Sequence, residues 1–123
     1  MNDKELFSHS ATILRISDMD RSMSFYIDRL GFNPTFTWKE PVEYAVLKRG
    51  DISIHLSLSD GPFVVPDGVL LYIFVYDIES VYKECLDKQV PITSPLETRD
   101  YMMRDFDIKD PDGYLICFGQ GQG

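Results

Sequence analysis

One sequence pattern occurs twice in this chain. The segment from Asp18 to Arg29 aligns without a gap with the segment from Asp77 to Lys88, and each begins with Asp, an apolar residue and an acid. A second repeat follows, because residues 49–55 match residues 111–117 in a turn and in the strand after it. Internal repeats of this kind indicate two copies of one structural module.

The bulk properties narrow the class of protein. A chain of 123 residues with 44% hydrophobic side chains is long enough for one compact domain with a buried core. Its formal net charge of −8 argues against a nucleic-acid partner. No apolar run is long enough to span a bilayer, and the N-terminus lacks the apolar core of a signal peptide. The two cysteines, Cys85 and Cys117, are too few and too distant for a disulfide framework, so we expect a cytoplasmic protein with reduced thiols.

The first module is expected to contain a strand, a helix and three more strands. Apolar, β-rich residues 11–16 predict a buried strand, and Asp18 supplies the oxygen that caps the following helix. Gly31 ends this helix. Its apolar face comprises Met19, Met23, Tyr26, Ile27 and Leu30. Further strands are predicted at about residues 35–39, 43–48 and 52–58, after a polar arm at residues 1–9.

The second module repeats this order after a Gly- and Pro-rich linker at residues 59–68. A strand is expected at about 69–76 and a helix at about 78–88, whose inward side chains are Ile78, Val81, Tyr82, Cys85 and Leu86. A loop bounded by Pro91 and Pro95 precedes strands near 95–98, 101–108 and 114–118. The prediction is an α+β fold, a single domain (1–123) of two strand–helix–strand–strand–strand modules at about 10–58 and 69–118.

Two segments resemble a known superfamily. Residues 14–26 with Leu30-Gly31-Phe32, and residues 104–116, resemble the vicinal-oxygen-chelate superfamily of glyoxalase I, extradiol dioxygenases, fosfomycin-resistance enzymes and bleomycin-resistance proteins. The resemblance covers roughly residues 11–118. It implies that the strands form a curled, cup-shaped mixed sheet with the helices outside and the ligand inside.

The resemblance also implies four positions where the metalloenzymes of this superfamily carry His or Glu ligands. In this chain those positions hold Ala11, His55, Leu70 and Cys117. Alanine and leucine have no donor atom, whereas a catalytic divalent site normally takes three protein ligands and an open position. We therefore expect no metal and no other cofactor. The chain resembles the metal-free bleomycin-resistance type, which confers antibiotic resistance without chemistry by binding a drug in the cleft of a homodimer.

Strand alternation assigns candidate ligand-binding residues to the cup. If His55 faces the cup, Ser53 and Ser57 do too, while Ile54 and Leu56 face the helices. Cys117 faces the cup from the last strand, where a buried, unreactive thiol is favoured over a nucleophile because no base is placed to activate it. A histidine bonded only to a neighbouring strand is an equally good interpretation of His55.

Aromatic and sulfur side chains complete the candidate set. Trp38 and Phe36 share a face and are suited to stacking on a planar ligand, or to packing in the core or a dimer seam. Tyr101 and Met103 suit an adaptable apolar wall, or ordinary core. Asp105 and Asp107 alternate with apolar residues and are expected at the rim of the cup or in solvent.

Three hypotheses follow from this set. The favoured one is a dimeric binding protein that sequesters a small, partly aromatic ligand, and the acidic net charge permits that ligand to be cationic. The second is a metal-dependent lyase, isomerase or dioxygenase of the glyoxalase kind. The third is an interaction domain whose cup is closed by large side chains. The sequence does not decide whether the cup forms within one chain or by exchange of modules between two.

Overall fold

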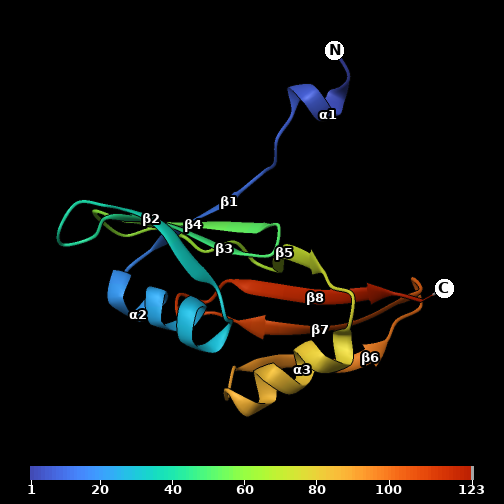
Figure 1. Cartoon of the computed structure of the whole chain (residues 1–123). Coiled ribbons are helices and arrows are strands. Elements are labelled where there is room, and N and C mark those ends of the chain that lie inside the picture. Colours follow the sequence, from blue (N-terminus) through green and yellow to red (C-terminus); the bar gives the residue numbers. More distant parts are fainter. Residues whose placement is uncertain (123) are drawn as a thin grey trace.

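The computed structural model describes residues 1–122 and contains two mixed sheets of four strands (Figure 1). The strand orders are β1-β4-β3-β2 and β5-β8-β7-β6, so the two sheets have the same topology. In each sheet the first and last strands of the module pair in parallel, and the other neighbours are antiparallel. The predicted α+β fold of two repeated modules is confirmed.

The elements follow the predicted order closely. The first module comprises β1 (Thr12–Ile16), α2 (Met19–Ser24), a π-helical turn η1 (Phe25–Arg29), β2 (Asn33–Trp38), β3 (Tyr44–Arg49) and β4 (Ile52–Leu58). The second comprises β5 (Val69–Phe74), α3 (Ile78–Asp87), β6 (Ile92–Thr98), β7 (Met103–Lys109) and β8 (Leu115–Gly121).

Equivalent aspartates begin the two main helices. The Asp18 carboxylate accepts a hydrogen bond from the Arg21 amide, and the Asp77 carboxylate accepts one from the Ser80 amide. These bonds satisfy amides that have no partner inside the helix. The first helix departs from expectation after Ser24, where it widens into η1 and the Leu30 amide bonds to the Phe25 carbonyl.

Two expectations in the second module are wrong. Leu86 was expected to face inward but is 51% exposed, because it lies about 80° around the helix from the buried Ile78. Pro95 was expected to end a loop but lies within β6, the edge strand of its sheet. The register shifts between Ser94 and Glu97, and an edge strand with such an irregularity tolerates a proline.

The helix-bearing faces of both sheets share one apolar core. Helix α2 packs on β4, and α3 packs on β7 and β8. Leu14, Leu56, Ile73 and Ile116, two from each sheet, belong to the same buried cluster. Because these faces turn toward a common core, the opposite face of each sheet points away from it.

A buried hydrogen bond joins the modules within this core. Tyr26 has no exposed surface, and its hydroxyl donates to the Asp110 carboxylate at 2.8 Å. The other Asp110 oxygen accepts from the Tyr114 amide at 2.8 Å and the Asp112 amide at 3.0 Å. Desolvation of the Asp110 carboxyl raises its pKa even though these hydrogen bonds favour the charged form.

Removing the Tyr26 hydroxyl should weaken the association of the two modules. We expect Tyr26→Phe to lower the free energy of unfolding by about 1–3 kcal/mol, because it leaves a buried oxygen of Asp110 without its donor. Tyr82→Phe is the matched control, since the Tyr82 ring packs against Phe106 without using its hydroxyl within residues 1–122. Urea unfolding of both variants measures the difference, and equal losses would contradict this role for Tyr26.

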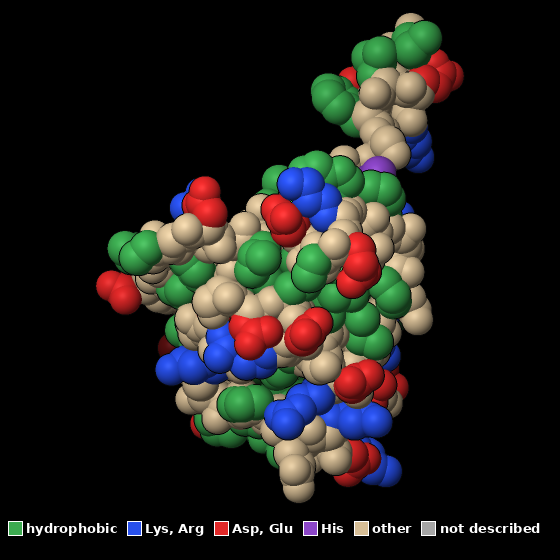
Figure 2. Space-filling view, turned by 90° about the vertical axis from the view of Figure 1, so that its left-hand side faces the viewer, with side chains coloured by type: hydrophobic (Ala, Val, Ile, Leu, Met, Phe, Trp, Pro, Cys, Tyr) green, Lys and Arg blue, Asp and Glu red, His purple; other side chains and the backbone are tan. Residues whose placement is uncertain are grey.

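The N-terminal residues stand clear of the body of the molecule (Figure 2). They include a short helix, α1 (Asp3–Leu6), which is capped by the Asn2 side chain. The apolar side chains of Leu6 and Phe7 are 60% and 74% exposed on this arm. No helix within the described residues is long and apolar enough to cross a membrane.

Candidate functional site

The outward-pointing face of the first sheet, here the first open face, carries several predicted site residues. His55 lies beside Val46 of β3 and Ile13 of β1 in the strand register, on the side away from the core. Its Nδ1 lies 2.7 Å from the Tyr44 hydroxyl, so His55 has a partner on the neighbouring strand. The first open face comprises Ile13, Arg15, Phe36, Trp38, Tyr44, Val46, Lys48, Ser53, His55 and Ser57.

Ser53 and Ser57 lie on either side of His55 along β4. Ser57 is half-buried and pairs with Tyr44, whereas Ser53 is buried beside Lys48. The Ser53 hydroxyl has no hydrogen-bond partner among residues 1–122. A buried hydroxyl without a partner is uncommon, but this oxygen has almost no surface that a group outside the chain could reach.

Phe36 and Trp38 lie at the edge of the first open face. Phe36 pairs with Val46 and Trp38 with Tyr44, which places both rings on the side of His55. They are 55% and 51% exposed, so neither packs in the core of the chain. The Lys39 ammonium lies 4.5 Å from the centre of the Trp38 ring, a cation–π contact.

The outward-pointing face of the second sheet, here the second open face, is built around Asp105. Its Oδ2 accepts hydrogen bonds from the hydroxyls of Tyr72 at 2.9 Å and Tyr101 at 2.6 Å. Its Oδ1 accepts from Nε of Arg99 at 2.7 Å. The second open face comprises Leu70, Tyr72, Phe74, Glu97, Arg99, Tyr101, Met103, Asp105, Asp107, Lys109, Leu115, Cys117 and Gly119.

The expectation that Asp105 lies in solvent or at a rim is wrong. The residue is 1% exposed, because Tyr72 and the Arg99–Tyr101 turn cover it. Desolvation opposes its ionisation, but hydrogen bonds from Tyr101, Arg99 and Tyr72 outweigh that effect, so the pKa of Asp105 lies below its ordinary value. The same bond to Asp105, with desolvation, raises the pKa of Tyr101 to about 12. Asp105 is therefore a charged, fully bonded anchor of the face.

Asp107 differs from Asp105 although it lies on the same face. It is half-buried, and its carboxylate forms no ion pair within residues 1–122. Cys117 pairs with it in the sheet register and is 3% exposed. Desolvation, followed by the nearby Asp107 and Asp105 carboxylates, raises the pKa of the Cys117 thiol, so the thiol stays protonated near neutral pH. This protonation state agrees with the inert thiol inferred from the sequence.

The remaining predicted residues lie at the end of the second open face. Tyr101 is 60% exposed even though its hydroxyl reaches Asp105. Met103 is half-buried and pairs with Gly121. Phe74, which was absent from the predicted set, is 72% exposed, and its ring lies 4.9 Å from that of Tyr72.

Gly119 allows the Tyr72 ring to reach Asp105. A Cβ atom at position 119 would overlap the Tyr72 ring and hydroxyl. We expect Gly119→Ala to displace Tyr72 and to cost about 1–3 kcal/mol of stability. Gly121→Ala on the same strand is the control, since its Cβ would make only an ordinary contact with Met103. Thermal unfolding that ranks the two variants equally would show that Tyr72 does not depend on this glycine.

The chain does not provide a divalent-metal site of the kind that its resemblance implies. Among residues 1–122 no three His, Cys, Asp or Glu side chains converge. Of the four implied positions, Ala11 and Leu70 have no donor atom, and the Cys117 thiol lies on the second open face, on the other sheet from His55. His55 remains as one imidazole already bonded to Tyr44. This donor set does not fit a catalytic metal, which needs three ligands.

The candidate site residues fall into two groups, one on each open face. His55, Ser53, Ser57, Phe36 and Trp38 lie together on the first face, whereas Tyr101, Met103 and Cys117 lie together on the second. The shared core separates the two groups within one chain. The chain thus belongs to a class of small α+β folds. In this class two repeated modules each present one open sheet face, and here both faces carry polar and aromatic residues.

Comparisons with known proteins identify the family. The chain matches the model of the Glyoxalase/Bleomycin resistance protein/Dioxygenase superfamily over residues 7–118. The chain belongs to this superfamily. No curated protein matches it significantly in sequence.

Solved structures share the fold along nearly their whole length. TioX from Micromonospora sp. ML1 has a TM-score of 0.80 at 19% identity, covering 94% of this chain and 99% of TioX. A glyoxalase/bleomycin resistance protein/dioxygenase from Alicyclobacillus acidocaldarius has a TM-score of 0.78 at 19% identity, covering 93% and 91%. The bleomycin-binding protein of Streptomyces verticillus, complexed with copper(II)-bleomycin, has a TM-score of 0.71 at 25% identity, covering 95% and 97%.

Proposed function

We propose that this protein binds a small, partly aromatic, cationic molecule without transforming it, in a cleft between two copies of the chain. The observation that carries this proposal is the pair of uncovered sheet faces that both point away from the shared core. Each face is one wall of a binding site, and a second copy supplies the opposite wall. We also propose that the two modules make one domain, since their helix-bearing faces share a core.

Exposed aromatic side chains support a second copy as the partner. Phe36 and Trp38 on the first face, and Phe74 and Tyr101 on the second, are all more than half exposed. Apolar and aromatic surface concentrated on one face is typical of interaction sites. Pairing the first face of one copy with the second face of another would cover all four rings.

The charges of the two faces are complementary. The first open face carries the cations Arg15 and Lys48. On the second face the anions Asp105, Asp107 and Glu97 outnumber the cations Arg99 and Lys109. Opposite charges steer and orient association, so pairing of unlike faces is favoured over pairing of like faces.

The same surfaces suggest the ligand. The half-buried Asp107 carboxylate is free to pair with a cation, and the exposed Trp38 ring is free to stack on a planar group. The Streptomyces verticillus neighbour binds copper(II)-bleomycin, which makes sequestration of an antibiotic the model for this chain. The two free cysteines suit a reducing, cytoplasmic location.

Metal-free bleomycin is the first probe of this proposal. Trp38 is the only tryptophan, so its emission reports directly on the first open face. We expect a saturable change in Trp38 emission and a matching heat of binding, with affinity reduced at least about tenfold by Trp38→Ala. The absence of both signals would overturn a bleomycin-type ligand. Retention of one divalent metal per site after dialysis would instead support a glyoxalase-like enzyme.

A further inference from the structure

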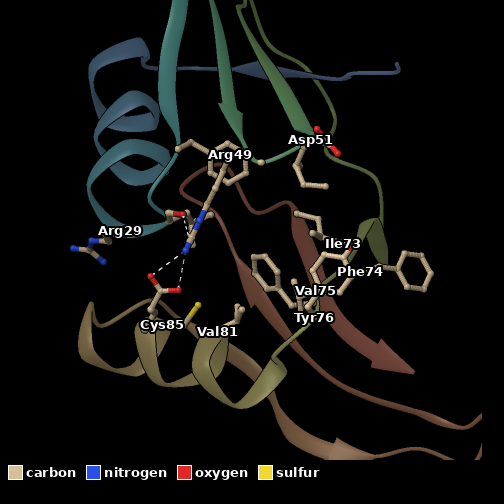
Figure 3. Close-up of a pocket in the computed structure, with 15 residues that line it drawn as sticks. Arg29, Arg49, Asp51, Ile73, Phe74, Val75, Tyr76, Val81 and Cys85 are labelled. Carbon is tan, nitrogen blue, oxygen red and sulfur yellow. Dashed lines mark hydrogen bonds and ion pairs between the residues drawn. The ribbon is translucent and has the colours of Figure 1, made fainter. Parts of the chain in front are cut away.

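A cavity lies in the seam between the modules, and Phe74 is the one residue of the open faces that lines it (Figure 3). Its volume is about 480 Å³, within the range of about 300–1,000 Å³ that small-molecule pockets occupy. The first module contributes the end of η1 and the turn between β3 and β4, and the second contributes the end of β5 and one side of α3. Ile73 and Phe118 line it from the core side of their sheet, so the cavity lies on the helix-bearing side.

The walls of this cavity are largely apolar. Leu30, Phe32 and Ile52 line it from the first module, and Val81 and Cys85 project from α3 (Figure 3). Cys85 is 3% exposed, and desolvation raises the pKa of its thiol to about 11. The thiol is therefore neutral near pH 7 and adds no charge to the wall.

The charged pair that crosses the cavity is complete. Arg49 crosses the seam, and its guanidinium donates to both Glu84 oxygens at 3.0 and 3.1 Å and to the Leu30 carbonyl at 2.9 Å. Gly31, with a positive φ of 73°, packs against this guanidinium, where a Cβ would lie 3.1 Å from Nη1. The other two charged lining residues, Arg29 and Asp51, have no ion-pair partner within residues 1–122, but both are exposed to solvent. The buried walls of the cavity therefore offer no unpaired acid or base for a charged ligand.

We propose that this inter-module cavity is a second binding site, and that it takes an uncharged, apolar, aromatic-sized molecule. A neutral ligand gains from burial against the apolar walls. A charged ligand loses its hydration without gaining a partner, because the Arg49–Glu84 pair is complete. Tyr76, fully exposed at the mouth, adds an aromatic surface beside the entrance.

Two dyes with the same aromatic skeleton test the site and its selectivity. N-phenyl-1-naphthylamine is neutral, whereas 1-anilinonaphthalene-8-sulfonate carries a sulfonate on that skeleton. We expect the neutral dye to bind the wild-type protein at least about tenfold more tightly than the anionic dye. Equal or tighter binding of the anionic dye would overturn the proposed ligand class.

The two cysteines locate the bound dye without any substitution. Cys85 lines the cavity, whereas Cys117 lies on the second open face. Alkylation by iodoacetamide, followed for each cysteine by peptide mass spectrometry, should slow more at Cys85 than at Cys117 when the neutral dye is present. Both thiols are 3% exposed, so a ligand that stabilises the fold slows both, and only a ligand in the cavity slows Cys85 further. Equal slowing of the two cysteines, protection of Cys117 alone, or protection of neither would overturn the site. Failure of the bleomycin titration would leave this result unaffected, because Cys85 lines the cavity whereas Trp38 lies on the first open face.

A substitution that fills the cavity gives a second test of the site. Val81→Trp places a large ring in the cavity and should abolish binding of the neutral dye, whereas Val64→Trp, at a linker position that is 91% exposed, should not. Unchanged dye binding by a folded Val81→Trp protein would contradict the proposal. If Val81→Trp does not fold, the alkylation rates of the wild-type protein decide the outcome.

Discussion

Replacing Asp105 by Asn should lower the free energy of unfolding by about 2–3 kcal/mol at neutral pH. The substitution removes the charge that Arg99 neutralises and replaces an acceptor oxygen on a residue that is 1% exposed. It also disturbs the hydroxyl donors of Tyr72 and Tyr101. The estimate lies below the usual loss for a broken buried ion pair because the Arg99 side chain is 21% exposed and can regain water.

Asp107→Asn is the matched control for this prediction. It makes the same chemical change two residues further along β7 on the same face, but Asp107 has no ion-pair partner within residues 1–122. We expect its effect to stay within about 0.5 kcal/mol. Urea unfolding at one fixed protein concentration compares the two variants, and similar losses would show that the Asp105 cluster does not stabilise the fold.

The difference between wild type and Asp105→Asn should depend on pH in one direction. The pKa of Asp105 is lower in the folded protein than its ordinary value of about 3.9, so the folded state favours the charged form. This contribution is fully present above pH about 4 and is lost as the pH falls through the lower, folded-state value. A difference that stayed constant into strong acid would contradict an ionised Asp105.

Reversing one charge on either open face should weaken the proposed dimer. Lys48→Glu puts an acid on the first face, opposite the acidic second face of the other copy. Asp107→Lys puts a cation on the second face, opposite Arg15 and Lys48. Each change replaces attraction by repulsion, and we expect each to raise the dimer Kd at least about tenfold, or 1.4 kcal/mol.

An exposed lysine on α3 controls for the change in net charge. Lys83→Glu makes the same substitution as Lys48→Glu at a position outside both open faces. Its dimer Kd should match that of the wild type when both are measured by sedimentation equilibrium. An equal weakening by Lys83→Glu would mean that net charge, rather than the open faces, controls association.

The local structure of this chain was predictable because local signals dictate it. Alternation along β4 placed Ser53, His55 and Ser57 on one face, and the capping Asp18 and Asp77 marked where both helices begin. The same alternation placed Phe36 and Trp38 together. Each of these predictions needs only neighbours in sequence and the period of a strand or helix.

The Asp105 cluster was missed because its partners come from elsewhere in the chain. Alternation gives the face of Asp105, but its burial depends on Tyr72 in β5 and on the Arg99–Tyr101 turn. One signal was present in the sequence, since Gly119 in the last strand leaves room for a large side chain to cross it.

The outward direction of the two open faces also could not be predicted from local sequence patterns. An apolar helix face shows that it is buried, but not which sheet it packs against. Long-range contacts such as Tyr26 with Asp110, 84 residues apart, and Arg49 with Glu84 set how the modules pack. These contacts set the direction of each open face, and the proposed pairing with a second copy is argued from that direction.

Mixing the two charge-reversed proteins tests the central claim most directly. Suppose that the first face of one copy pairs with the second face of the other. A dimer made only of Lys48→Glu chains, or only of Asp107→Lys chains, then has like charges opposite each other. Combined in one dimer, the two variants restore opposite charges at both interfaces. Sedimentation equilibrium of the equimolar mixture should therefore show a dimer close to wild-type affinity, while each variant alone is weakened. A mixture that stays as weak as its components, or an Asp107→Lys protein that dimerises like the wild type, would contradict a cleft built from unlike faces of two copies.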